Sequence, residues 1–295
     1  EFAKIVGWLV GDGSIYGRSV QLTNRNINVH LGFRATIETL YPDCTTTIAN
    51  IKSRVTKSDL YKSTVRYKVL NKRKKQIVKD LESCGLMYKK GKEKFIPDCI
   101  KNGSDMCLLS FIGAYTDTDS CLRNSGKVIV AYKTASSKLA YDLQFVVRKL
   151  GFIASITEYH GYYAINVSEA RAFLRKIYPY SIKASSLYDE NDLLDTRISS
   201  GNLIRRSVAK DILKQYGMKR IQKLSGISLY QKQKYISVDS VRKAAASVQA
   251  PLPDYLTNNA IKWVKVSNVT EYGEADVYDL TVEDKHEFVC QGIIV

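Results

Sequence analysis

Long hydrophobic runs are missing from this 295-residue sequence. No uninterrupted apolar segment approaches the roughly 20 residues that a helix needs to cross a bilayer. The first residues, Glu-Phe-Ala-Lys, lack the pattern of a signal peptide. We therefore expect a soluble, intracellular protein. At 45% hydrophobic residues the chain has the composition of a folded protein, and its length allows more than one domain.

Zinc-binding and disulfide patterns are also absent. The six cysteines are scattered without a C-x-x-C pair, and the chain has only three histidines, so a zinc site is not expected. We interpret the cysteines as reduced residues of the core rather than as a disulfide framework.

The whole chain has a formal net charge of +16, and acidic residues are scarce relative to basic ones in two parts of it. Residues 1–100 hold 19 Lys and Arg against 9 Asp and Glu, and residues 196–243 hold 12 against 2. Residues 101–195 hold 11 Lys and Arg against 10 Asp and Glu, and residues 244–295 hold 3 against 8. This basic excess favours a polyanionic partner, because each neutralised phosphate releases counterions. The change of sign predicts a domain boundary near residue 243.

The sequence does contain an internal repeat. The stretch IVGWLVGDGS near the N-terminus matches LLSFIGAYTDTDSC further along the chain. When Gly7 is aligned with Ala114, small residues recur four positions apart in both stretches, and each stretch continues with an aspartate, Asp12 or Asp119. After each aspartate, the hydrophobic periodicity predicts two strands, a helix, two strands and a helix. The expected strand and helix regions are residues 19–26, 28–43, 45–71 and 73–86 in the first half, and residues 127–135, 137–152, 154–167 and 169–181 in the second.

The glycines of the first stretch indicate close helix packing. Glycine in a helix interior is less favourable than alanine by about 1 kcal/mol. Gly7 and Gly11 lie one turn apart beside an apolar face, so we interpret them as the surface on which a second helix approaches closely. Such packing brings Asp12 and Asp119 to the same place, at the C-terminal ends of two helices. Each aspartate alone is equally compatible with an ordinary helix end.

Two adjacent carboxylates point to a cation site. They repel each other unless a cation lies between them, and oxygen ligands of this kind suit Mg²⁺. Bound Mg²⁺ can polarise a phosphodiester and position a water molecule. Together with the basic charge, this arrangement favours hydrolysis of a nucleic-acid backbone.

At these residues the sequence resembles a single-chain LAGLIDADG homing endonuclease. VGWLVGDGS and FIGAYTDTDS look like the paired motifs of that family, and KEKFIPDCI resembles its K-x-x-P lead-in. The resemblance implies an α+β fold of two pseudo-symmetric αββαββα repeats, residues 1–100 and 101–195, whose saddle-shaped antiparallel sheets lie along the DNA major groove. It also implies a monomer that makes Mg²⁺-dependent double-strand breaks at a long, asymmetric site in double-stranded DNA.

The resemblance assigns roles to single residues. Asp12 and Asp119 would be the metal-binding catalytic acids, sharing two or three Mg²⁺ ions, with the carbonyl groups of Gly11 and Thr118 as further ligands. Lys133 and Lys68 are candidates for charge-stabilising catalytic groups, with ordinary phosphate contact as the alternative. The candidate DNA-contacting residues, on strand faces that alternate apolar and polar side chains or in the basic segment, are Asn24, Arg25, Arg54, Arg66, Lys68, Lys133, Arg205 and Arg206.

The second motif departs from the family pattern. Ala114 and Ser120 replace glycines, and Thr116 takes an apolar position. We expect Ser120 to adopt a left-handed helix cap less easily than glycine does. Asp117 is the alternative to Asp119, which we prefer because it aligns with Asp12. A cleavage-deficient protein that binds DNA or RNA therefore remains an alternative function.

The last hundred residues differ from the repeats. Residues 196–243 predict a basic helical segment that contacts DNA, with two amphipathic stretches around Ser225 that form either a helix-turn-helix or a linker. Residues 244–295 predict a small β segment that resembles the C-terminal part of an intein splicing domain, with Asp279 and His286 matching residues that assist C-terminal cleavage. Because the nucleophile and the final His-Asn pair of that domain are missing, we expect a vestigial splicing segment. A splicing fragment is the third alternative.

Overall fold

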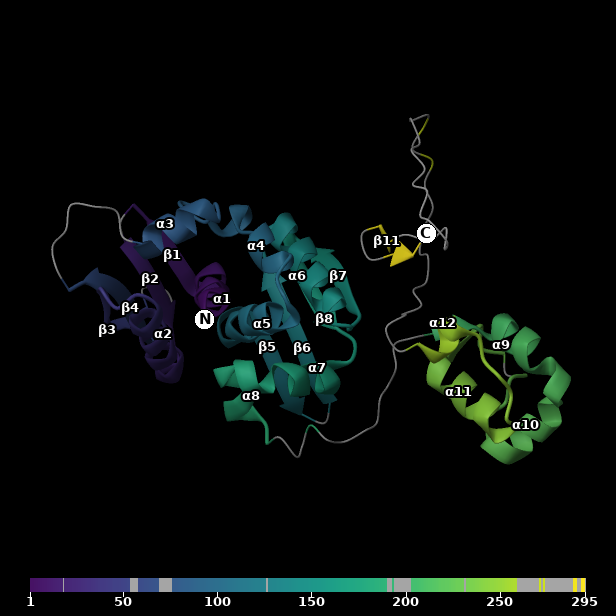
Figure 1. Ribbon diagram of the computed structural model, residues 1–295. Coiled ribbons are helices and arrows are strands. Elements are labelled where there is room, and N and C mark those ends of the chain that lie inside the picture. The colour runs from purple at the N-terminus through teal and green to yellow at the C-terminus, as the bar shows by residue number, and fades with distance from the viewer. Residues whose placement is uncertain are drawn as a thin grey trace. The chain divides into compact units, whose positions relative to one another are not determined.

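The computed structural model (Figure 1) describes residues 1–17, 19–53, 58–68, 76–125, 127–189, 193, 203–230, 232–258, 271, 273, 289–290 and 293–294. Three candidate residues, Arg54, Asp279 and His286, lie outside these ranges. The chain divides into two compact units, residues 1–197 and 198–295, and each is described by itself.

Unit 1 repeats one order of elements. The first repeat consists of α1 (Phe2–Asp12), β1 (Gly13–Tyr16), β2 (Ser19–Asn24), α2 (Ile27–Leu40), β3 (Cys44–Lys52), β4 (Asp59–Tyr67) and α3 (Gln76–Ser83). The second consists of α5 (Asp105–Asp119), β5 (Ser120–Ser125), β6 (Lys127–Thr134), α6 (Ser137–Lys149), β7 (Ala154–Tyr159), β8 (Tyr162–Val167) and α7 (Ala170–Ile177). The short elements η1 (Gly91–Glu93) and α4 (Asp98–Lys101) connect the repeats, and η2 (Tyr178–Tyr180) and α8 (Ile182–Leu187) follow the second. The predicted αββαββα order and the α+β class are confirmed.

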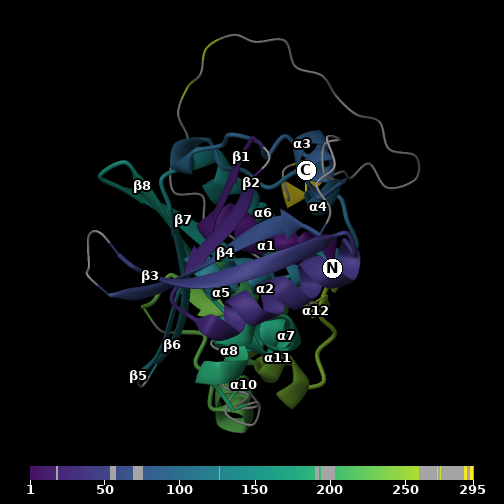
Figure 2. The same ribbon diagram turned by 90° about the vertical axis from the view of Figure 1, so that its left-hand side faces the viewer.

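Each repeat forms a four-stranded antiparallel sheet, with strand order β1-β2-β4-β3 in one and β5-β6-β8-β7 in the other. Alternate side chains enter the core because successive residues of a strand point to opposite faces. Val128, Val130 and Tyr132 of β6 are buried, whereas Ile129 and Lys133 between and after them are exposed. In the first repeat α2 packs against β3 and β4 (Figure 2). The sequence therefore predicted correctly that one face of the strands is apolar and the other is available for contacts.

The two repeats join through α1 and α5. These helices lie side by side at the centre of unit 1, with the first sheet on one side and the second on the other (Figure 1). Both are almost wholly buried, and one hydrophobic core runs through both repeats. Trp8 of α1 and Phe111 and Tyr115 of α5 are among its largest fully buried side chains. Because the core crosses between the repeats, it fixes the two helix ends relative to each other.

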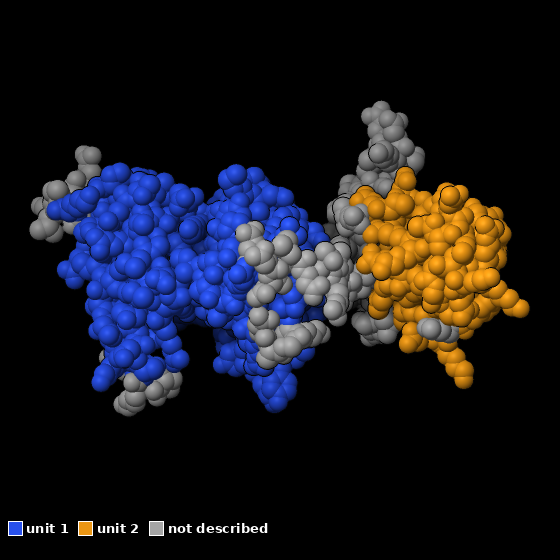
Figure 3. Space-filling view, turned by 90° about the horizontal axis from the view of Figure 1, so that it is seen from below, with its two compact units in different colours: residues 1–197 blue, residues 198–295 orange. Residues whose placement is uncertain are grey.

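Unit 2 (Figure 3) has its own small core. Its described elements are β9 (Leu203–Arg205), α9 (Arg206–Leu213), η4 (Lys214–Tyr216), α10 (Met218–Ser225), β10 (Tyr235–Ser237), α11 (Val238–Ser247), α12 (Asp254–Thr257), β11 (Val289–Cys290) and β12 (Ile293–Ile294). Two expectations are corrected. The boundary near residue 243 falls inside α11, whose buried Ala244 and Ala245 belong to this core. The helix after Gly226 begins only at Val238, so α10 and α11 are not joined by a tight turn.

Candidate active site at the ends of two helices

Gly7 and Gly11 lie where α1 touches α5. A Cβ atom at Gly7 would collide with the carbonyl oxygen of Phe111 and would lie 2.9 Å from the Cβ of Ala114. A Cβ atom at Gly11 would lie 2.7 Å from the Cβ of Thr118 and closer still to its hydroxyl. The residues aligned in the two motifs therefore face each other across the interface. The predicted close approach of the two backbones is confirmed.

Asp12 and Asp119 are the last residues of these helices and act on each other electrostatically. Burial raises the pKa of the Asp12 carboxyl, although a hydrogen bond and nearby cations oppose the shift. Burial and then the negative charge of Asp12 raise the pKa of Asp119. Both carboxylates also lie at the negative ends of helix dipoles. Together these effects make the pair a place that favours bound cations.

Two lysines that the sequence reasoning did not select lie next to the aspartates. The Lys94 amine donates a hydrogen bond to the carbonyl oxygen of Gly11. The Lys183 amine donates to the carbonyl oxygen of Ser120 at 2.6 Å and lies 3.2 Å from the Ser120 hydroxyl. Burial lowers the pKa of both amines, and the neighbouring aspartates oppose that shift. Each repeat therefore ends with a half-buried lysine beside a carboxylate of the site.

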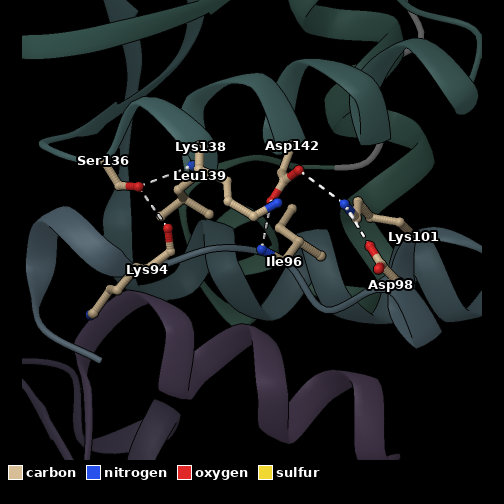
Figure 4. Close-up of polar contacts among 8 residues, drawn as sticks. All are labelled: Lys94, Ile96, Asp98, Lys101, Ser136, Lys138, Leu139 and Asp142. Atoms are coloured by element: carbon tan, nitrogen blue, oxygen red, sulfur yellow. Dashed lines mark hydrogen bonds and ion pairs between the residues drawn. The ribbon is translucent and has the colours of Figure 1, made fainter. Parts of the chain in front are cut away.

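The segment that carries Lys94 is held in place by α6 (Figure 4). The Ser136 hydroxyl donates to the Lys94 carbonyl oxygen at 2.6 Å, and the Ile96 backbone N–H donates to Asp142 at 2.9 Å. Asp142 also pairs with Lys101, at 3.1 Å. With its backbone fixed on α6, the Lys94 side chain extends toward α1. The K-x-x-P lead-in, which begins at Lys94, was the sequence signal that could have identified this residue.

Asn24 contacts the first aspartate directly. Its side-chain amide donates to the Asp12 carboxylate at 2.6 Å. The buried His30 holds the end of the same strand, because its Nε2 lies 3.1 Å from the Asn24 carbonyl oxygen and its Nδ1 lies 2.6 Å from the Ser63 hydroxyl. Burial lowers the pKa of His30. A neutral ring that donates from Nε2 and accepts at Nδ1 satisfies both contacts.

The two halves of the site are not identical. Asn24 and Thr134 hold equivalent positions, because each side-chain oxygen accepts a hydrogen bond from the backbone two residues later. Asn24 reaches Asp12, whereas Thr134 is buried and the hydroxyl that faces Asp119 is that of Tyr115, at 3.5 Å. Within the described residues, Asp12 therefore has a short amide hydrogen bond, and the side-chain hydrogen bond of Asp119 is the long one from Tyr115.

Asp117, the alternative to Asp119, has a different environment. Its carboxylate is 3% exposed and accepts hydrogen bonds from Trp8 Nε1 at 3.0 Å, the Ser181 hydroxyl at 2.7 Å and the Lys183 backbone N–H at 2.9 Å. These contacts join α5 to α1 and α8 and use the carboxylate oxygens inside the protein. Asp117 therefore stabilises the packing of these helices.

The substitutions in the second motif fit the fold. The Thr116 hydroxyl donates to the Ile112 carbonyl oxygen at 2.7 Å and lies 2.9 Å from the Tyr132 hydroxyl, so the buried polar group is satisfied. Ser120 has φ −115° and its counterpart Gly13 has φ −87°. Both positions are extended, so the left-handed cap that we expected to be difficult for Ser120 is not required.

Several predicted residues lie elsewhere. Lys133 is exposed on β6, with its amine 4.8 Å from the Tyr162 ring, and Lys68 is exposed after β4. Neither is among the cations that lower the pKa values of both aspartates, which are Lys94 and Lys183. The sequence therefore did not select the two lysines whose charges act on both aspartates, and the catalytic roles of Lys133 and Lys68 stay predictions. Arg25, Arg66 and Arg205 are exposed.

Arg206 does not fit its predicted role as a DNA contact. Its side chain is 6% exposed and donates to the carbonyl oxygens of Gln233 at 2.9 Å, Ser228 at 2.6 Å and Tyr235 at 3.3 Å. An arginine whose donors are bound to backbone inside unit 2 stabilises the fold and cannot also reach a phosphate. The basic stretch of sequence did not distinguish it from its exposed neighbour Arg205.

The donor set of the site suits a hard cation. Asp12 and Asp119 offer carboxylate oxygens, the ligand type that Mg²⁺ prefers. Of the two carbonyl groups predicted as further ligands, that of Gly11 accepts a hydrogen bond from the Lys94 amine. Among the described residues, no three His, Cys, Asp or Glu side chains cluster closely enough to hold a metal ion by themselves. A cation at this place would therefore need further ligands, such as water or phosphate oxygens.

Comparison with known proteins first concerns the second repeat of unit 1. A family model described as LAGLIDADG-like domain matches residues 106–178. The matched segment begins near the start of α5, the helix that ends at Asp119, and extends through α7.

The chain is also similar to parts of larger proteins. It is 24% identical over 329 residues to the replicative DNA helicase DnaB of Synechocystis sp., covering 100% of this chain and 36% of the helicase. It is 28% identical over 191 residues to the replication factor C small subunit of Methanocaldococcus jannaschii, covering 60% of this chain and 9% of that protein. The chain thus spans about a third or less of these two relatives.

The chain is also similar to a solved structure of I-DmoI in complex with DNA and Mn, with 14% sequence identity and a TM-score of 0.43; the match covers 60% of this chain and 94% of that chain.

In the described part of the present structure, every helix is too short or too polar to span a bilayer.

Proposed function

We propose that this chain is a LAGLIDADG homing endonuclease of the intein-encoded type, which makes Mg²⁺-dependent double-strand breaks in DNA at a long, asymmetric site. The observation that carries the proposal is the pair of mutually repelling carboxylates, Asp12 and Asp119, at the ends of two close-packed helices. The net charge of +16 supports a nucleic-acid substrate. The exposed faces of the two antiparallel sheets supply side chains for base and phosphate contacts.

In this proposal each residue of the site has a separate chemical role. Asp12 and Asp119, with the carbonyl groups of Gly11 and Thr118, would hold Mg²⁺, which when bound would polarise the phosphodiester and favour ionisation of a water molecule. Asn24 orients the Asp12 carboxylate through its 2.6 Å hydrogen bond. The side chains of the site are half-buried, which strengthens the charge interactions among them.

Lys94 and Lys183 are the proposed electrostatic stabilisers. Their amines lie beside the backbone at the ends of the two aspartate-bearing helices, and burial lowers their pKa values. Each amine could turn from its carbonyl partner to a phosphate oxygen as negative charge develops there. Such preorganised donors are often the largest single contribution to catalysis.

We expect Lys94→Met to lower the single-turnover cleavage rate by about 10²–10³-fold, the range found when one such donor is removed. DNA affinity should change only a few-fold, because one phosphate contact contributes little to a large interface. Lys92→Met is the matched control: it removes the same charge from an exposed residue of the same segment. Equal losses in the two variants would contradict the proposed role of Lys94.

The similarity to unrelated proteins supports the intein-encoded type. A helicase and a replication factor subunit have different activities, yet each contains a segment that matches this chain. A segment shared in this way is what an element inserted into different host proteins would produce. In the proposed splicing remnant the structure describes one short antiparallel pair, β11 and β12, and Asp279 and His286 lie outside the described residues.

Unit 2 is proposed to extend the DNA contact. On α10, Ile221 enters the core while Lys219, Arg220 and Lys223 are exposed on the other side of the helix. Residues 203–230 contain only one acidic residue, Asp211, to balance their basic side chains. This one-sided positive charge is complementary to a phosphate backbone.

Replacing Lys219, Arg220 and Lys223 together by serine should reduce the slope of log K against log salt by up to about 2.7, because each lost phosphate contact contributes about 0.9. These exposed side chains leave the core unchanged, so the thermal melting curve should be preserved. A salt slope equal to that of the parent would exclude this surface from the DNA interface without affecting the proposal for the aspartates.

The proposed activity is tested by incubating the chain with a randomised DNA library and Mg²⁺ and sequencing the ends of the products. Discrete double-strand breaks at one sequence would establish the endonuclease and its site. Salt-sensitive binding without breaks would instead favour the cleavage-deficient alternative.

A further inference from the structure

Three cysteines gather on one side of unit 1, near the ends of α3, α4 and α5. The Sγ atoms of Cys84 and Cys99 lie 3.5 Å apart, although the residues are 15 positions apart in sequence. Cys107 is near enough to Cys99 for the two to affect each other electrostatically, and its own Sγ lies 3.9 Å from the Ile100 carbonyl oxygen. Scattered core thiols, as expected from the sequence, would not converge in this way.

The sulfur atoms of Cys84 and Cys99 lie close enough for a disulfide to form after a small movement. An S–S bond is about 2.05 Å long, so the sulfurs need to approach by only about 1.5 Å. Cys99 is exposed and Cys84 is half-buried, so a small oxidant reaches Cys99 first. Burial, together with the contact to Cys99, raises the pKa of the Cys84 thiol to about 12, which keeps it protonated until its partner has reacted.

We propose that Cys84 and Cys99 form a site of reversible oxidation, which a low-molecular-weight disulfide such as oxidised glutathione converts to an intramolecular disulfide. The Cys99 thiolate attacks one glutathione sulfur, the glutathione S–S bond breaks, and one glutathione thiolate leaves. The Cys84 thiol then loses its proton and attacks the Cys99 sulfur, and the second glutathione thiolate leaves. Two protein thiols are oxidised while one glutathione disulfide is reduced to two thiols.

The disulfide would close the loop that carries Lys94. Residues 84–97 connect α3 to α4, and the Lys94 backbone among them is already held by Ser136, the N-cap of α6. Closing a loop of about 15 residues restricts the unfolded chain and raises stability. The bond would therefore fasten the two ends of the Lys94 segment to each other. This inference rests on the thiol geometry alone and is independent of the proposed endonuclease activity.

The test uses the full chain, kept folded and incubated with oxidised glutathione at graded ratios to reduced glutathione. Free thiols are then alkylated, and the digested protein is analysed by mass spectrometry. The expected product is a peptide pair linked through Cys84 and Cys99. Unit 1 should melt on the order of 5–10 °C higher in the oxidised than in the reduced form. Reduction with dithiothreitol should remove the shift.

Single replacements identify the pair. Cys84→Ser and Cys99→Ser should each abolish the linked peptide and the redox-dependent shift in melting temperature. Cys121→Ser, which removes another exposed thiol of unit 1, should retain both. The proposal is overturned if the linkage forms only in denaturant, if Cys107 is the residue linked to Cys99, or if the shift persists in Cys84→Ser.

Discussion

Asp119→Asn is expected to abolish DNA cleavage, a loss of at least about 10³-fold, while DNA binding survives. The asparagine has nearly the same shape but removes one of the two charges that make the helix ends a cation site. Asp12→Asn should have the same effect, because the two carboxylates occupy equivalent positions. Single-turnover cleavage with Mg²⁺ and DNA affinity without Mg²⁺ measure the two consequences separately.

The same replacement should stabilise the fold at neutral pH. Burial and the charge of Asp12 raise the pKa of Asp119 in the folded state, so the ionised carboxylate is penalised there relative to the unfolded chain. The parent therefore loses stability as the pH rises through the ordinary and then the raised pKa of this carboxyl. Asparagine does not titrate, so the melting temperature of Asp119→Asn should exceed that of the parent at neutral pH, and the difference should shrink in acid.

Asp117→Asn is the matched control, two residues away on the same helix. Its new amide would face the Trp8 Nε1–H donor, and leaving that contact unsatisfied should reduce stability by about 1–3 kcal/mol. Below its melting temperature the variant should still cleave DNA. If Asp117→Asn lost cleavage and Asp119→Asn kept it, the proposed metal ligands would be wrong.

Gly7→Leu is expected to destabilise unit 1 by about 3 kcal/mol or more, and Gly7→Ala by about 1–3 kcal/mol, since overpacking forces helices apart. Even a single Cβ atom at this position would collide with the Phe111 carbonyl oxygen and crowd Ala114, and a backbone carbonyl cannot rotate away. Separation of α1 and α5 would also move Asp12 away from Asp119. Denaturant unfolding gives the loss of stability, and cleavage at a temperature where the variant is folded gives the effect on the site.

Gly91→Ala provides the comparison for this prediction. A Cβ atom at Gly91 meets nothing within 4 Å, so its effect should lie within about 0.5 kcal/mol of the parent. If Gly7→Ala were as harmless as Gly91→Ala, close backbone packing would not be the reason for the glycine in α1.

Much of unit 1 could be predicted because its signals are local and occur twice. The strand and helix order followed from hydrophobic periodicity, and Gly7 and Gly11 predicted the surface of α1 on which a second helix approaches closely. Unit 2 was harder to predict. The charge change near residue 243 indicated a boundary where α11 continues, because net charge describes the surface and α11 is defined by its buried side.

The sequence by itself determined the doubled repeat, its αββαββα order, the α+β class and the two aspartates, because these depend on spacing along the chain. Only the tertiary structure decided which lysines accompany the aspartates. Lys94 and Lys183 come from segments after α3 and α7, and no sequence period relates them to Asp12. It also decided that Asp117 and Arg206 are structural, because burial and hydrogen-bond partners depend on residues distant in the chain. Local patterns specify elements, and only packing specifies which side chains meet.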